Sequence, residues 1–312
     1  MTEHFVTYFD SRFLAVGMAL RESLKALGCD FHLWVICIDS LAEEQIKRLA
    51  FPDMTAIPLS SVEDSRLVAV KGGRSLGEYC WTLTPFAPEA VFNAVSHVDR
   101  VTYVDADLFF FSDPHEIFEE FEGSDKHVLI TEHAYAPELD RSEESGRFCV
   151  QFMIFRRTPE GLRVLRWWQD RCLEWCFDRV EDGKYGDQKY LDEWPTLFAD
   201  AVHVFSKTEK TLGPWNVDFM LSTAAAYFCP IFYHFQSFRL IDDNTARLYA
   251  GVRISRAADR FYGPYLGVVR EQLKILRSMG VHQRRMPEPI RKFELLRKIY
   301  MALTRRNRYV KL

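Results

Sequence analysis

Apolar runs of strand length alternate with amphipathic segments along the first half of the chain. Residues 31–38 form an unbroken apolar run, which is typical of a strand buried on both faces of a parallel sheet. Further short apolar runs occur at residues 5–9, 101–104 and 148–155, and segments with helical spacing lie between the runs. This alternation predicts an α/β fold in which helices cover a mainly parallel central sheet.

The composition excludes several other classes of protein. Of the 312 residues, 48% are hydrophobic and 14% are aromatic, so the chain is neither disordered nor collagen-like. No uncharged apolar stretch approaches the roughly 18 residues of a membrane span, and the N-terminus lacks the pattern of a signal peptide. The seven cysteines, an odd number, fit reduced thiols. We therefore expect a cytoplasmic protein.

Charge is distributed unevenly along the chain. From residue 284 onward ten Lys and Arg face two Glu, a net charge of +8, whereas the rest of the chain carries −12. A helix over residues 290–304 would have one apolar face, made of Phe293, Leu296, Ile299, Tyr300 and Leu303. We divide the chain into a main domain, residues 1–280, and a basic amphipathic helical tail, residues 281–312.

A basic tail of this kind suits one of two partners. It binds an anionic membrane surface, which would place the protein peripherally on the inner face of the cytoplasmic membrane, or it docks on the main domain or a partner subunit. The acidic body disfavours nucleic acid as a partner.

Two carboxylates follow the buried strand at residues 101–104. In Asp105-Ala106-Asp107 the acidic residues are two apart, so they point to the same side at a strand end, where ligands of open α/β sheets bind. Two close carboxylates are costly without a cation between them, and their hard oxygens suit Mn²⁺ or Mg²⁺. The pattern predicts a divalent metal site, and the alternative is a polar loop after a strand.

A histidine and an arginine lie at the end of an aromatic run, residues 230–238, which we predict to be a strand. His234 could add an imidazole to the two carboxylates and leave metal positions open for diphosphate oxygens. The alternative is a histidine satisfied within the core. Arg239 is placed to neutralise phosphate charge.

Asp187 and Gln188 follow a Gly- and Asp-rich segment, residues 181–186, and precede a predicted helix. One hypothesis places both side chains in a pocket, where they bind sugar hydroxyls or lie beneath an anomeric carbon. The alternative is that Asp187 only caps the helix.

The order of these motifs resembles that of GT-A-fold nucleotide-sugar glycosyltransferases, most closely the bacterial family 8-like group. The resemblance covers about residues 5–240. Its motifs are Thr7-Tyr8-Phe9-Asp10, Glu78-Tyr79-Cys80-Trp81-Thr82-Leu83, the stretch from Tyr103 through the Asp pair to Pro114, Gly186-Asp187-Gln188, Gly213-Pro214-Trp215-Asn216 and Tyr233-His234 through Arg239. It implies a single GT-A (Rossmann-like) catalytic domain.

The resemblance also implies roles for individual residues. Asp105, Asp107 and His234 would hold Mn²⁺ or Mg²⁺, which bridges the diphosphate of the donor and stabilises the leaving nucleotide, so Asp105 counts among the donor-binding residues as well. The remaining roles are nucleoside contacts for Thr7, Tyr8 and Asp10, a phosphate contact for Arg239, and catalytic positions beside the reacting sugar for Asp187 and Gln188.

The implied activity is transfer of a sugar from a nucleotide-diphosphate sugar, with a UDP-sugar expected, to a glycan or lipid-linked acceptor in bacterial surface polysaccharide biosynthesis. Retention follows from the resemblance, and front-face displacement is the preferred mechanism, because the family lacks an obvious carboxylate nucleophile.

The chain departs from the family pattern at two places, and two other functions remain as alternatives to sugar transfer. Cys149-Val150-Gln151 replaces a usual Asn-x-Gly, and Ser237 replaces the glycine after the histidine.

A sugar-nucleotide nucleotidyltransferase would need a Gly- and Lys-bearing loop, and residues 7–13 contain neither. A non-catalytic carbohydrate- or lipid-binding protein of the same fold is disfavoured by the retained Asp, Asp and His set.

Overall fold

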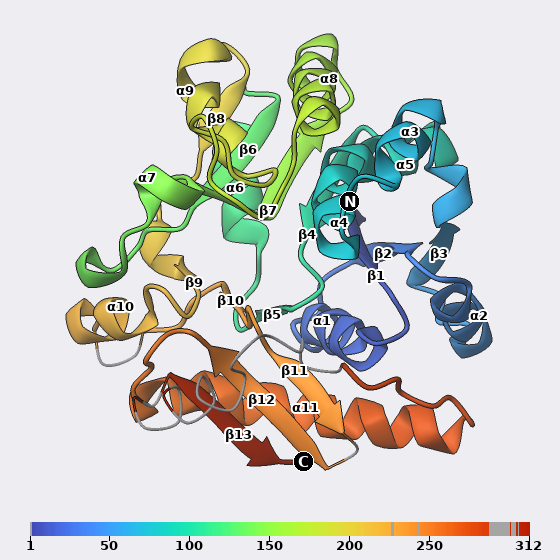
Figure 1. Ribbon diagram of the computed structural model, residues 1–312, viewed down its shortest axis with the longest axis vertical. Coiled ribbons are helices and arrows are strands. Elements are labelled where there is room, and N and C mark those ends of the chain that lie inside the picture. The colour runs from blue at the N-terminus through green and yellow to red at the C-terminus, as the bar shows by residue number, and fades with distance from the viewer. Residues whose placement is uncertain (1, 226–227, 243, 287–299, 301–303, 305) are drawn as a thin grey trace.

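A seven-stranded sheet forms the centre of the protein, with helices on both faces (Figure 1). The computed structural model describes residues 2–225, 228–242, 244–286, 300, 304 and 306–312. In this part of the chain the sheet order is β3-β2-β1-β4-β7-β6-β8. Only the pairs β4–β7 and β7–β6 are antiparallel, so β7 runs against the other strands. The predicted α/β fold with a mainly parallel sheet is confirmed.

The strands of the main sheet are β1 (Glu3–Phe9), β2 (Phe31–Cys37), β3 (Met54–Pro58), β4 (Arg100–Val104), β6 (Val128–Glu132), β7 (Phe148–Arg156) and β8 (Val202–Val204). Smaller sheets contain β5 (Leu108–Phe110), β9 (Thr211–Leu212), β10 (Phe232–His234), β11 (Arg239–Asp242), β12 (Thr245–Ala250) and β13 (Asn307–Lys311). The α-helices are α1 (Leu14–Ala26), α2 (Ser40–Leu49), α3 (Ser65–Lys71), α4 (Leu76–Leu83), α5 (Ala87–Ala94), α6 (His115–Gly123), α7 (Ser142–Ser145), α8 (Pro159–Glu174), α9 (Trp194–Leu197), α10 (Val217–Thr223) and α11 (Asp259–Ser278).

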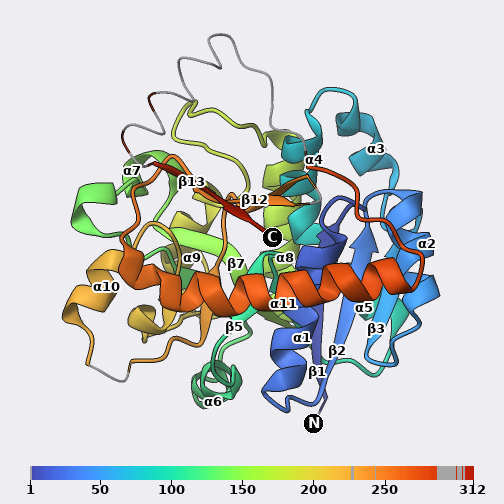
Figure 2. The same cartoon turned by 90° about the horizontal axis from the view of Figure 1, so that it is seen from below.

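Two hydrophobic cores form, one on each face of the main sheet. Buried side chains of α1, α2, α6 and α11 make one core, and those of α3, α4, α5 and α8 make the other. Helix α11 lies against α1 and crosses it, as Figure 2 shows. Because helices cover both faces, the carboxyl ends of the strands, rather than a face of the sheet, are left for a ligand.

The aromatic run at residues 230–238 is not one continuous strand, as predicted, because it is a strand only over Phe232–His234. Its first part is β10, and Ser237 then adopts a left-handed backbone conformation (φ 67°) that turns the chain into β11. Strand β10 pairs with β5 and β9, whereas β11 begins a separate antiparallel sheet with β12 and β13. This break leaves His234 at the exact end of β10 and Arg239 at the start of β11.

The C-terminal region is attached to the body at both of its described ends. The helix that the sequence predicts over residues 290–304 lies almost wholly outside the described residues, so it stays a prediction. Residues 281–286 are not helical, and Val281 and Met286 are buried. Residues 307–311 are β13, which pairs with β12 rather than continuing a helix.

Within the described ranges, no helix combines the length and apolar character that a bilayer crossing requires.

Close packing at the start of α8 predicts a sharp difference between two helical glycines. A Cβ at Gly161 would lie 2.4 Å from the carbonyl oxygen of Arg156, which is backbone and cannot move aside, whereas a Cβ at Gly267 in α11 meets nothing within 4 Å. We expect Gly161→Ala to lower the free energy of unfolding by about 1–3 kcal/mol through overpacking. Gly267→Ala, the control, should raise it by up to about 1 kcal/mol. Urea unfolding of both variants measures this, and equal stabilities would contradict the packing described.

Candidate metal and donor site

A tight turn directly after β4 carries the two carboxylates. The N–H of Leu108 donates to the carbonyl of Asp105 at 3.1 Å, which closes the turn, and the N–H of Asp105 donates to the carbonyl of Gln151 at 3.0 Å. From the sequence we expected Asp105 and Asp107 to converge because residues two apart in a strand point to the same side. In the structure both follow the carboxyl end of β4, as predicted, but the turn and not the strand brings them together.

His234 reaches this turn because β10 pairs antiparallel with β5, the strand that follows Asp107. The register places His234 opposite Leu108, and the N–H of Phe235 donates to the carbonyl of Asp107 at 2.9 Å. The imidazole Nε2 lies 3.1 Å from Oδ1 of Asp107 and 3.6 Å from Oδ2 of Asp105. One ligand atom from each residue falls within 4.8 Å of the others, so two carboxylates and an imidazole suit a divalent cation.

Gln151 on β7 holds the other side of the imidazole. Its Oε1 lies 3.0 Å from Nδ1 of His234, and its side chain is fully buried. If Nδ1 donates to this oxygen, the lone pair of Nε2 faces the two carboxylates, which is the tautomer that a metal ligand needs. Gln151, which departs from the family pattern, therefore supports the histidine.

Burial and mutual charge set the ionisation of the cluster. Burial raises the pKa of Asp105, although His234 opposes this shift. At Asp107 burial also favours the neutral acid, but the charge and hydrogen bond of His234 outweigh it and lower the pKa. Burial likewise opposes a charge on His234, yet Asp107 and then Asp105 raise its pKa well above the usual value. The asymmetry follows the shorter distance between His234 and Asp107. The cluster thus attracts positive charge.

Asp187 is buried close to this cluster and does not cap a helix. The 3₁₀ turn that follows, Lys189–Glu193, has Gln188 at its N-cap position and no side-chain cap, so the capping alternative is wrong. Burial raises the pKa of Asp187 to about 7, and the negative charge of Asp105 adds to the shift. Among the described residues its Oδ2 has no hydrogen-bond partner. A buried acceptor left open in this way is suited to a ligand hydroxyl.

A pair of tyrosines lies between Asp187 and Asp105. The hydroxyls of Tyr8 and Thr84 are 3.1 Å apart, and Thr84 lies close enough to Asp187 to lower the pKa of that carboxyl in part. The rings of Tyr8 and Tyr103 are 5.9 Å apart, and the Tyr103 hydroxyl donates to Asp105 Oδ1 at 2.8 Å. Tyr8, expected beside the nucleoside, therefore belongs to the packing that connects the two carboxylates.

The sequence also predicted contacts with the donor for Gln188, Thr7 and Asp10. The side-chain amide of Gln188 donates to the carbonyl of Ser145, a contact with α7 and not with the Asp and His cluster. Thr7 is fully buried within β1, and its Oγ1 has no hydrogen-bond partner among the described residues. Asp10 follows β1 and is bound by the Arg12 guanidinium, whose Nε lies 2.7 Å from Asp10 Oδ2.

Arg239 lies near enough to Asp107 for the charges of the two side chains to interact. Its guanidinium lies 5.0 Å from the centre of the Phe13 ring, and NH1 donates to the carbonyl of Phe238 at 2.8 Å. Burial lowers its pKa, Asp107 opposes that shift, and the nearby Arg247 and Arg12 add repulsion. Arg239 therefore lies near both Asp107 and two further guanidinium groups, and positive charge of this kind suits a diphosphate.

An aromatic wall, His133 with Tyr135 and Trp215, completes the surroundings of His234. His133 stacks on Tyr135 with ring centres 4.6 Å apart, and Trp215 meets the His234 ring edge-on at 5.4 Å. Trp215 Nε1 donates to the carbonyl of His133 at 2.6 Å.

The sequence analysis missed the roles of Gln151, Thr84 and Tyr103. The position of Tyr103, two residues before Asp105 on the same strand face, was a usable signal.

Comparison with solved structures identifies the fold. The galactosyltransferase LgtC, solved with donor and acceptor sugar analogs, superimposes with a TM-score of 0.53 at 12% identity, over 88% of this chain and 99% of LgtC. The glycosyltransferase GlyE of Streptococcus pneumoniae TIGR4, in its apo form, gives a TM-score of 0.52 at 13% identity, over 92% of this chain and 65% of that chain. The chain has the GT-A glycosyltransferase fold.

Comparison of sequences finds relatives of unknown function. No family model matches the chain. YfnF of Bacillus subtilis strain 168 is 30% identical over 261 residues, which cover 78% of this chain and 84% of YfnF. YfnD of the same strain is 30% identical over 276 residues, which cover 85% of this chain and 88% of YfnD. Both are described as uncharacterized proteins. At this identity and coverage, the chain belongs to the family of YfnD and YfnF.

Proposed function

We propose that the protein is a metal-dependent glycosyltransferase that moves a sugar from a nucleotide-diphosphate sugar to an acceptor. The observation that carries this proposal is the cluster of Asp105, Asp107 and His234, which lies at the carboxyl end of β4 in a GT-A fold. Three ligand atoms from the protein leave positions for phosphate oxygens on the same cation.

The three residues would hold Mn²⁺ or Mg²⁺. The bound cation supplies Lewis acidity, which neutralises the diphosphate and stabilises it as a leaving group. Arg239 contributes a second positive charge beside Asp107. Gln151 keeps Nε2 of His234 directed at the carboxylates.

Asp187 is the residue that we place beside the transferred sugar. Its buried, unpartnered Oδ2 accepts a hydrogen bond from a sugar hydroxyl and fixes the orientation of the ring. With Asp187 engaged in this way and Gln188 bound to Ser145, the described residues around Asp187 favour front-face displacement with retention over attack by a protein nucleophile.

The finer assignments follow from the family 8-like motifs. The donor is a UDP-sugar, and the acceptor is a glycan or a lipid-linked precursor of a bacterial surface polysaccharide. The protein would act in the cytoplasm, and the basic tail would hold it at the inner face of the membrane.

Binding and turnover test the function in one series. Thermal shift with UDP, CDP, GDP and ADP, with and without Mn²⁺, followed by hydrolysis of the matching nucleotide sugars, should give a metal-dependent response to one base. Activity only with a sugar 1-phosphate and a nucleoside triphosphate would identify a nucleotidyltransferase instead. Binding without any turnover would indicate a non-catalytic protein.

Substitution of a metal ligand should separate cation binding from folding. We expect Asp107→Asn to abolish Mn²⁺ binding, measured by calorimetry, and to lower sugar transfer at least about a hundredfold, equivalent to about 3 kcal/mol. The control is Asp113→Asn, an exposed carboxylate a few residues away, whose hydrogen bonds within the described part of the chain come from the His115 N–H and a cysteine thiol. Full activity of Asp107→Asn, or of enzyme treated with EDTA, would contradict the metal assignment.

The raised pKa of Asp187 predicts opposite effects on stability and on activity. Because its pKa is about 7 in the folded protein, against about 3.9 when unfolded, Asp187 costs stability increasingly as pH rises from 4 to 7. Asp187→Asn should therefore have a higher free energy of unfolding than the wild type. The difference between the two proteins should be larger at pH 8 than at pH 5, by on the order of 2 kcal/mol. Sugar transfer should fall while affinity for the nucleoside diphosphate persists. A variant that is less stable at both pH values, with unchanged transfer, would contradict this role.

A further inference from the structure

A cavity of about 240 Å³ opens where β1 and β2 end. Its volume is several times the roughly 30 Å³ that one water occupies in the liquid. Two aliphatic side chains, two carboxylates and two guanidinium groups line it: Ile38, Leu76, Asp10, Asp39, Arg12 and Arg284. Apolar surface together with paired acceptors and donors suits a flat heterocycle with an attached hydroxylated ring.

Arg12 connects this cavity to the metal cluster. It binds Asp10 and lies close enough to Arg239 to lower the pKa of that guanidinium, and Arg239 in turn acts on Asp107. A nucleoside diphosphate whose phosphates meet Asp107 and Arg239 would therefore extend its nucleoside toward the cavity.

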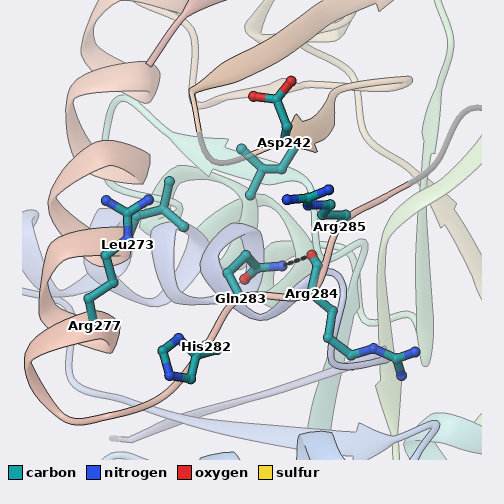
Figure 3. A pocket seen from close by; sticks show the side chains of 8 residues that line it. Asp242, Leu273, Arg277, His282, Gln283, Arg284 and Arg285 are labelled. Atoms are coloured by element: carbon teal, nitrogen blue, oxygen red, sulfur yellow. Dashed lines mark hydrogen bonds between the residues drawn. The ribbon is translucent and has the colours of Figure 1, made fainter.

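Most of the cavity wall follows β1 and β2, but Arg284 comes from the segment after α11. Gln283 fixes this segment to the β1–α1 loop and to the start of α1: its Nε2 donates to the carbonyl of Arg12 in the loop, and its Oε1 accepts from the Ala15 N–H in the helix at 2.9 Å. Next to it, the N–H of Met286 donates to the carbonyl of Leu240 at 2.9 Å. Figure 3 shows the side-chain amide of Gln283 bonded to the Arg284 carbonyl, at a distance of 2.9 Å.

The guanidinium of Arg284 is held loosely over the cavity. It lies 3.6 Å from Oδ2 of Asp39 and 3.5 Å from Oγ of Ser11, both longer than an ordinary hydrogen bond. Its side chain is 57% exposed, so its donors remain open to a ligand. Arg285, the next residue, leaves the chain in another direction, beside Asp242 (Figure 3).

We infer that Arg284 binds the nucleoside part of the donor, and that Gln283 positions it there. The inference rests on the proposed function, and it assigns part of the donor site to a segment beyond the region of family resemblance. The guanidinium donates to carbonyl or ribose oxygens of the nucleoside, while the phosphates are bound at the metal end.

Two ligands separate the two ends of the site. Calorimetry in Mn²⁺ compares the tightest binder among UDP, CDP, GDP and ADP with inorganic pyrophosphate, which occupies only the metal end. We expect Arg284→Ala to weaken the nucleoside diphosphate about tenfold, the size of one charge-assisted hydrogen bond, and to leave pyrophosphate unchanged. Gln283→Ala should act in the same way, and the double variant should be no weaker than Arg284→Ala alone.

Arg285→Ala is the matched control, because it removes the same charge from the adjacent residue without touching the cavity. Wild-type affinity is expected for this variant, and melting temperatures check that all variants fold. Equal losses for Arg284→Ala and Arg285→Ala, a parallel loss of pyrophosphate binding, or an unaffected Arg284→Ala would each overturn the inference. Failure of the wild type to bind any of the four diphosphates would instead overturn the proposed function.

Discussion

The pairing of β5 with β10 is the contact on which the whole site depends. It carries His234 to the turn that holds Asp105 and Asp107, although the histidine lies far along the chain. Strands of three residues are weak by themselves, and aromatic packing secures them. Phe232 of β10 stacks on Phe152 of the main sheet at 5.6 Å and meets Phe110 of β5 edge-on at 5.8 Å. The hydrophobic core therefore fixes the spacing of the three ionisable groups.

The same region contains polar atoms that the fold leaves without partners. Oδ2 of Asp187 and Nε2 of Gln151 are buried without a hydrogen bond among the described residues. Each such atom lowers the stability of the folded state by roughly 1–3 kcal/mol. Well-packed cores on both faces of the sheet offset this loss. Unpaired polar atoms that are concentrated at one place are typical of a binding site that is formed in advance of its ligand, at some cost in stability.

Local sequence patterns predict the parts of the site that a single element determines. A buried strand that ends in Asp105 and Asp107 is visible in the residues themselves, whereas the place of His234 came from the order of motifs. Gln151 could not be assigned in this way, because its role depends on two strands distant in sequence. In the C-terminal region, the spacing of apolar residues predicted a helix over residues 290–304, whereas the strand β13 that follows depends on an open edge of β12 that only the tertiary structure reveals.

The reversed direction of β7 has a consequence for how such a site can diversify. The parallel strands end at the ligand edge, so the loops that follow them lie there. Strand β7 runs in the opposite direction and begins at this edge, so the loop that precedes it, residues 133–147, lies there as well. That loop begins with His133 and Tyr135 and ends at a strand whose position is fixed by pairing on both sides. Its length and composition can therefore change without altering the register of β1, β2 or β4. Proteins of one fold can in this way vary the residues at this edge while the cluster of Asp105, Asp107 and His234 stays unchanged.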